Sequence, residues 1–125
     1  MSLRSPLGKV LGRGSAGEGV HHWWVQRVTA VALIPLLVWF GASVLSLPLH
    51  SYEAVRGWLG QPWVALLTIL LLFTLVWHSK LGVEVVIEDY AHTKGMKTTL
   101  LLVSAFVHVL AGAAGIFAVL MLALS

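Results

Sequence analysis

The sequence predicts an all-α membrane protein of three transmembrane helices that run up, down and up from a cytoplasmic N-terminus. Three observations predict this fold. Of the 125 residues 58% are hydrophobic and 10% charged, the apolar residues form three long runs, and the basic residues gather on one side of those runs. A soluble domain would carry about a quarter charged residues. Most of the apolar surface is therefore expected to face a lipid bilayer.

The length suggests a single domain. Residues 1–19, which are basic and rich in Gly and Ser, are expected to form a flexible cytoplasmic N-terminal tail, and residues 20–125 the three-helix transmembrane anchor domain. The tail has no apolar core, so a secretory signal is not expected. With no cysteine, the chain has no disulfide, iron–sulfur ligand or thiol nucleophile of its own. The net charge of +3 is small and scattered, which argues against nucleic acid as a partner.

Each run is long enough to cross a bilayer. Residues 28–47 contain no charge and would form a helix of about 30 Å, in which Pro35 should cause a bend. The second run follows a Gly-Gln-Pro turn, is almost wholly apolar over residues 63–77, and then becomes amphipathic, so its helix should leave the bilayer near Glu84. The third run covers residues 98–125, enough to cross with some tilt.

The basic residues orient the helices. Seven of the eight would lie on the side of the N-terminus, and only Arg56 lies in the loop between the first two spans. Because cytoplasmic loops carry an excess of Lys and Arg, this distribution predicts a cytoplasmic N-terminus and an external C-terminus. The seven are Arg4, Lys9, Arg13, Arg27, Lys80, Lys94 and Lys97.

His78 is the strongest candidate for a functional residue within a span. An ionisable side chain at membrane depth is costly and therefore suggests a function. Gly82, one turn later on the same face, would let a flat ligand or another helix approach. Imidazole inside a helical bundle is a usual axial ligand of b-type haem. The alternative is a histidine that only hydrogen-bonds a neighbouring helix.

Asp89 and Tyr90 lie side by side at the end of the amphipathic part of the second run. Asp89 follows His78 by 11 residues, which on a continuing helix is 20° from the same stripe and roughly 16 Å further along. With Tyr90 it would offer a proton source and a hydrogen-bond donor at the membrane surface, which suits a quinone. The alternative is ordinary solvation of a helix end.

Two sets of ionisable residues are expected on the cytoplasmic side of the membrane. His21, His22 and Arg27 could contact haem propionates, lipid phosphates or carboxylates of a partner. Lys80 is expected to extend toward the interface near Glu84.

The third run carries a small-residue face with one polar group. This face, Ser104, His108, Gly112 and Gly115, predicts close packing with a hydrogen bond across helices. A second haem ligand at His108 is the less favoured alternative.

Two segments resemble a known family. Residues 78–92, HSKLGVEVVIEDYAH, are similar to the signature of the small hydrophobic anchor subunit of succinate dehydrogenase, respiratory complex II. Residues 14–30, GSAGEGVHHWWVQRVTA, look like the N-terminal pattern of its bacterial members close to the mitochondrial type.

The resemblance implies haem b shared with a larger three-helix cytochrome b anchor subunit. His78 would be one axial ligand and the partner would supply the other. His21 and Arg27 would approach the haem propionates. Tyr90, with Asp89 beside it, would bind ubiquinone, the substrate. A flavoprotein subunit and an iron–sulfur subunit would dock on the cytoplasmic face of the bacterial inner membrane, and this chain alone would not oxidise succinate. An anchor of fumarate reductase and a non-redox scaffold or transporter accessory subunit remain the alternatives.

Overall fold

The computed structural model describes residues 14–125, with side chains from Gly19 onward, and these residues are helical without strands. Three helices are long and apolar enough to cross a membrane: α2 (Gly14–Ser46), α4 (Pro62–Tyr90) and α5 (Lys94–Leu124). A short helix, α3 (Tyr52–Leu59), joins the first two. The prediction of an all-α fold with three transmembrane helices is confirmed. Residues 1–13 of the expected tail lie outside the described residues, and residues 14–19 form the start of α2.

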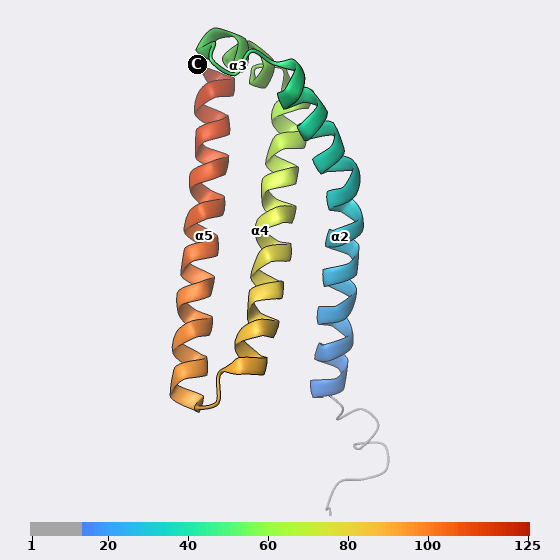
Figure 1. The fold of residues 1–125 in the computed structure, drawn as a ribbon, viewed down its shortest axis with the longest axis vertical. Helices are drawn as coiled ribbons and strands as arrows, with labels where there is room; N and C mark the ends of the chain where they lie inside the picture. Colours follow the sequence, from blue (N-terminus) through green and yellow to red (C-terminus); the bar gives the residue numbers. More distant parts are fainter. Residues whose placement is uncertain (1–13) are drawn as a thin grey trace, which may run out of the picture.

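The three long helices stand side by side with α4 in the middle (Figure 1). Helix α4 packs against both α2 and α5. In its most apolar stretch 28% of the residues are buried, against 11% for α2 and 6% for α5. Each outer helix therefore has only one packed side, and most of its apolar surface is left for lipid or for other subunits.

The ends of α4 follow from its sequence. Pro62 occupies the first turn, where a missing backbone N–H costs nothing, and Gln61 precedes it in an extended conformation. The helix then runs without a break to Tyr90. The connection to α5 is only residues 91–93, and Thr93 caps α5 by accepting a hydrogen bond from the Met96 backbone N–H at 3.2 Å. Such a short connection makes α4 and α5 antiparallel neighbours.

Helix α2 continues through Pro35 and leans over toward α3 in its later half (Figure 1). Proline has no backbone N–H, so the carbonyl one turn earlier loses its helical partner, and helices usually bend at such a point. The curvature seen in α2 agrees with the bend expected from the sequence.

Helix α3 is the element that the sequence analysis missed, because it treated the segment as an outer loop. Ser51 caps the helix by accepting a hydrogen bond from the Ala54 backbone N–H at 3.2 Å. Glu53 in the first turn and Arg56 in the last complement the helix dipole. Together with buried Leu59, these were available signals of a short amphipathic helix.

Two apolar clusters hold the helices together. Leu33 and Leu36 of α2 bury against Leu71 of α4. Near α3, Trp39 stacks on Trp58 with their ring centroids 5.9 Å apart, which ties α2 to the short helix. A second apolar cluster at this end comprises Leu59, Val64 and Val119.

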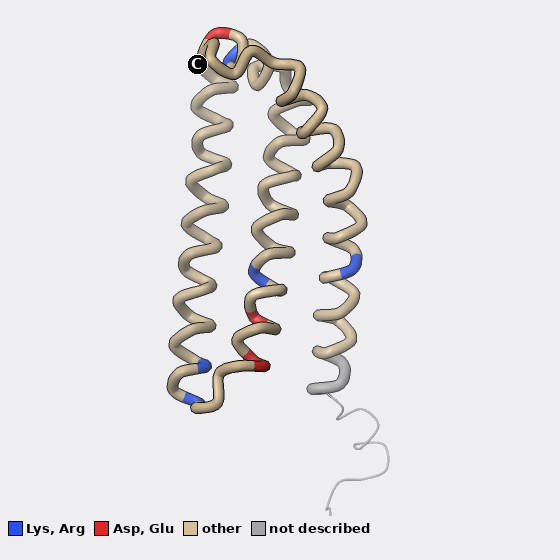
Figure 2. Tube along the Cα trace, viewed as in Figure 1, with Lys and Arg blue, Asp and Glu red and all other residues tan. Residues whose placement is uncertain are grey.

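The described charged residues lie in α3 or in the half of the bundle away from it, with Arg27 on α2 and Lys80 on α4 the farthest inside (Figure 2). Residues 28–46 of α2, 62–79 of α4 and 98–124 of α5 carry no charge, which is the pattern expected for a segment inside hydrocarbon. At the end away from α3, α4 finishes with acidic residues and α5 begins with basic ones. They are Glu88, Asp89, Lys94 and Lys97.

Candidate functional site

His78 faces α2 from the middle of the bundle. Its Nδ1 lies 2.9 Å from Oγ1 of Thr29, a residue 49 positions earlier in the chain. Thr29 is 8% exposed and sits one turn before Leu33, so the apolar contact between α2 and α4 fixes its position. The sequence analysis selected His78 and overlooked Thr29.

The hydrogen bonds of Thr29 favour one tautomer of His78, the one with the proton on Nδ1. A threonine hydroxyl has one proton and two lone pairs. Oγ1 of Thr29 donates that proton to the Val25 carbonyl at 2.8 Å, with the Gln26 carbonyl at 3.0 Å. While its proton is used in this way, only a lone pair faces His78, which assigns the proton of the His78 ring to Nδ1 and the lone pair to Nε2. Within the described part of the chain Nε2 has no hydrogen-bond partner, and the ring is suited to bind a metal through it.

His108 on α5, in contrast to His78, has a hydrogen-bond partner at both ring nitrogens. Its Nδ1 lies 2.7 Å from the Ser104 carbonyl, which can only accept, so Nδ1 is the donor. Its Nε2 is 3.1 Å from Oγ of Ser79 on α4, whose hydroxyl donates to it. Both ring nitrogens are therefore occupied. This is the hydrogen bond across helices that the sequence predicted for His108, and it disfavours a role as iron ligand.

The small-residue face around His108 packs as expected. A Cβ added at Gly112 would lie 3.5 Å from Val76, and one at Gly115 would lie 3.2 Å from Leu72. These glycines let α5 approach α4 closely. Beside them, a groove of about 550 Å³ runs between the two helices and is lined mainly by apolar side chains, with Lys80 and His108 at one end.

Glu84 connects α2 and α4. It pairs with Lys80 one turn earlier on α4, a side chain that the sequence placed near Glu84 without predicting the ion pair. It also lies 3.6 Å from Nε2 of His22 on α2, measured at Oε2. His22 was expected to act with His21 and Arg27 on an anionic group, but in this structure its nearest anionic partner is Glu84 of the same chain.

Gly82 meets α2 through Gln26, another residue that the sequence analysis overlooked. A Cβ added at Gly82 would lie 3.8 Å from Nε2 of the Gln26 side chain. The other amide atom, Oε1, is buried and has no hydrogen-bond partner among the described residues. Of the two expectations for Gly82, a flat ligand or another helix, the described chain shows the approach of a helix. A glutamine inside an apolar run was the signal that could have drawn attention to Gln26.

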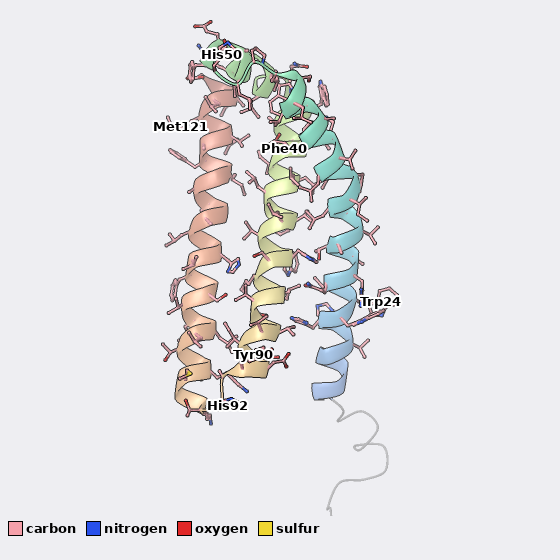
Figure 3. The ribbon with its side chains drawn as sticks, in the orientation of Figure 1. Trp24, Phe40, His50, Tyr90, His92 and Met121 are labelled. Carbon is pink, nitrogen blue, oxygen red and sulfur yellow. The ribbon has the colours of Figure 1, made fainter. Side chains whose placement is uncertain are left out.

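His21 and Arg27 lie apart from His78. Both are exposed, and the Arg27 guanidinium carbon is 5.3 Å from the centre of the Trp23 ring. Arg27 precedes Thr29 by two residues, or about 200° around α2, so it leaves the helix on the side away from His78. Figure 3 shows the neighbouring Trp24 on this outer side of α2. The structure thus leaves both proposed propionate contacts exposed, on different sides of α2.

Asp89 and Tyr90 end α4, as expected from a helix that continues beyond the apolar run. Both are exposed, Tyr90 to 76%. Figure 3 shows Tyr90 and His92 at the end of the bundle opposite α3, next to the connection between α4 and α5. Tyr90 lies 12 residues beyond His78, about 18 Å along the helix axis. A ligand at this end would be held by Tyr90 from one side only and would need other groups to enclose it.

Comparisons with known proteins agree with this architecture. Residues 1–114 match the family described as succinate dehydrogenase/fumarate reductase transmembrane subunit. The chain is 30% identical over 100 residues to the succinate dehydrogenase hydrophobic membrane anchor subunit of Rickettsia bellii, with 80% of each chain covered. It is 34% identical over 90 residues to the subunit of the same name from Paracoccus denitrificans, covering 72% of this chain and 70% of the relative. A succinate dehydrogenase membrane anchor subunit of Reclinomonas americana is 32% identical over 84 residues, covering 65% and 68%.

Proposed function

The chain belongs to the family of succinate dehydrogenase/fumarate reductase transmembrane subunits, and from this premise we propose that it holds haem b and completes a quinone-reduction site. It is a multi-pass membrane anchor subunit of succinate dehydrogenase, an oxidoreductase complex. The proposal adds what this chain's own side chains contribute to electron transfer inside the membrane.

The state of His78 is the observation that carries the haem proposal. Its Nδ1 is held by Thr29, and its Nε2 has a lone pair and no partner among the described residues. An imidazole in this state fits an axial ligand of haem iron. Haem b, when bound, supplies a centre that takes up and releases single electrons. Of the two histidines within the described spans, His108 has both nitrogens occupied. His78 would therefore be the ligand from this chain, and a larger three-helix cytochrome b anchor subunit would supply the second.

The assignment of His21 and Arg27 as propionate contacts rests on the resemblance to the family. Both side chains are exposed, and no described carboxylate pairs with Arg27. A guanidinium near a membrane interface binds carboxylates strongly and with fixed geometry. The two side chains would contact haem propionates at the interface with the partner anchor subunit, where α2 has apolar surface to bury.

The quinone site is proposed at the exposed end of α4. Reduction of a quinone takes two electrons and two protons. Tyr90 can donate a hydrogen bond to a quinone carbonyl, and Asp89 beside it can pass protons from the water boundary. Ubiquinone is the proposed substrate. Since the chain encloses Tyr90 on one side only, the remaining wall would come from partner subunits.

The proposed setting is the inner membrane of a bacterium. The N-terminus would face the cytoplasm, where the flavoprotein and iron–sulfur subunits dock and deliver electrons from succinate. The end of the bundle with Tyr90, Lys94 and Lys97 would then face these subunits. This end carries the exposed charged and polar groups that a soluble partner can contact (Figure 2).

The test compares His78→Ala with the matched variant His108→Ala in the complex purified through a tag on this chain. We expect His78→Ala to abolish or shift the low-spin haem signal in absorption and electron paramagnetic resonance spectra, and His108→Ala to leave it in place. Because both changes remove an imidazole from the bundle, a difference between them reports ligation. An unchanged spectrum in assembled His78→Ala complex would show that His78 does not bind the haem.

A further inference from the structure

We propose that Thr29 is a positioning residue for the haem ligand: its hydroxyl holds the Nδ1–H of His78 and so presents the Nε2 lone pair to the iron. This inference rests on the proposed function, in which His78 binds haem b. It concerns a residue on a different helix from the ligand, and it assigns that residue an effect on the haem that packing alone would not have.

The geometry favours one direction for the hydrogen bond between Thr29 and His78. Its single proton is directed to carbonyls of its own helix at 2.8 and 3.0 Å. Only an oxygen lone pair remains for the Nδ1 of His78 at 2.9 Å. If Nδ1 were unprotonated, the Thr29 hydroxyl would have to turn away from both carbonyls of its own helix to donate to the ring, and these back-bonds would be lost. Thr29 therefore selects the tautomer in which Nε2 is free to bind a metal.

Other buried threonines in the chain show that this interaction is particular to Thr29. Thr68 and Thr74 on α4 each donate to the carbonyl four residues earlier, both at 2.7 Å, and no described side chain bonds to either hydroxyl. Back-bonding of this kind is common for threonine in membrane helices. Thr29 makes the same back-bond and in addition receives a proton from an imidazole on another helix.

The hydrogen bond from His78 to Thr29 should also lower the reduction potential of the haem iron. A hydrogen bond from the Nδ1–H of a ligating histidine fixes the ring orientation and raises the basicity of the ligand, and loss of such a partner typically changes metal affinity or activity 10- to 100-fold. A more basic ligand favours the oxidised iron. Removing the hydroxyl of Thr29 should thus shift the equilibrium toward reduced haem.

The experiment measures the haem reduction potential and haem content of the purified complex carrying Thr29→Val, Thr29→Ser or Thr68→Val. Valine keeps the branched shape of threonine and removes only the hydroxyl, whereas serine keeps the hydroxyl. Thr68→Val removes an equally buried hydroxyl ten residues from His78. For Thr29→Val we expect the equilibrium to move about tenfold toward reduced haem, or about 59 mV for one electron. Thr29→Ser and Thr68→Val should both stay near the parent value.

The outcomes separate this inference from the proposed function. A shift of the haem reduction potential in Thr29→Val that is absent in Thr29→Ser supports the inference about Thr29. Loss of haem from the valine variant alone also supports it. The same potential in Thr29→Val and parent would overturn it, and so would equal shifts in the valine and serine variants, because the cause would then be packing. If His78→Ala retains the low-spin signal, the proposed ligand itself is wrong, whatever the Thr29 variants show.

Discussion

Two histidines on neighbouring helices have different chemistry because of the oxygen atoms that meet them. His78 is met at Nδ1 by a hydroxyl whose proton is already used, and its Nε2 is left with a lone pair. His108 is met at Nδ1 by a carbonyl and at Nε2 by a hydroxyl that donates. The sequence identified both residues as unusual within a span. Whether a ring nitrogen is left free in each histidine depends on Thr29, Ser79 and Ser104, which lie on three different helices.

Tyr90 carries the prediction about quinone chemistry. Tyr90→Phe keeps the ring and removes only the hydrogen-bond donor. We expect assembly and haem to survive while succinate-to-quinone turnover falls about tenfold or more, the effect of one lost hydrogen bond of about 1.4 kcal/mol. Succinate oxidation by an artificial acceptor that bypasses the quinone should remain nearly normal. Parallel assays of the two activities on the purified complex check this.

Tyr52→Phe provides the matched control. Tyr52 is the other tyrosine of the chain, is 62% exposed, and lies in α3 at the far end of the bundle. Its substitution should leave both activities unchanged. If Tyr90→Phe lowered both activities together, Tyr90 would have a role in holding the complex together. If it lowered neither, the quinone pocket would lie elsewhere.

At the scale of helices, the contact between α4 and α5 depends on small residues. Ser104 is buried, Gly112 faces Val76 of α4, and Gly115 lies so close to Leu72 of α4 that even a Cβ would be only 3.2 Å away. Since lipid tails are as apolar as leucine, close packing rather than the hydrophobic effect holds such helices together. The sequence predicted this face from the spacing of its small residues.

Gly115→Leu should weaken this contact. The larger side chain cannot fit beside Leu72 without moving it, and overpacking of this kind typically costs about 1–3 kcal/mol. The measurement is the temperature at which the purified complex loses this chain, and we expect it to fall. Gly95→Leu is the control, since a Cβ at Gly95 on the same helix meets no atom within 4 Å. Equal stability of the two variants would contradict the packing argument.

As a whole, the described chain is a row of three helices with α4 at its centre and broad apolar faces on both sides (Figure 1). Only 6% of the most apolar stretch of α5 and 11% of that of α2 are buried within the chain. Such a row exposes more apolar surface than a closed bundle of the same helices. This apolar surface is left for lipid or for other subunits of the complex.

The orientation of this row is the prediction at the scale of the molecule. Seven of the eight basic residues lie on the N-terminal side of the membrane under the proposed topology, and Arg56 alone lies on the other. The C-terminus lies beside α3, at the end opposite Tyr90 (Figure 1). Reporter fusions to the C-terminus should therefore read as external, and fusions to the connection between α4 and α5 as cytoplasmic. The reverse pattern would place Tyr90 on the wrong side for docking of the soluble subunits.

The sequence by itself determined the three spans, the packing face of α5 and the identity of the residues that stand out within the membrane. These properties are local, because hydropathy and helical spacing act over neighbouring turns of one helix. It missed α3, whose signals are a single cap and a short amphipathic pattern. Only the tertiary structure decided that Thr29 meets His78, that His22 lies near Glu84 and that His108 has no free nitrogen. A proton's position on an imidazole depends on atoms brought near it by packing, and those atoms come from helices far apart in the chain.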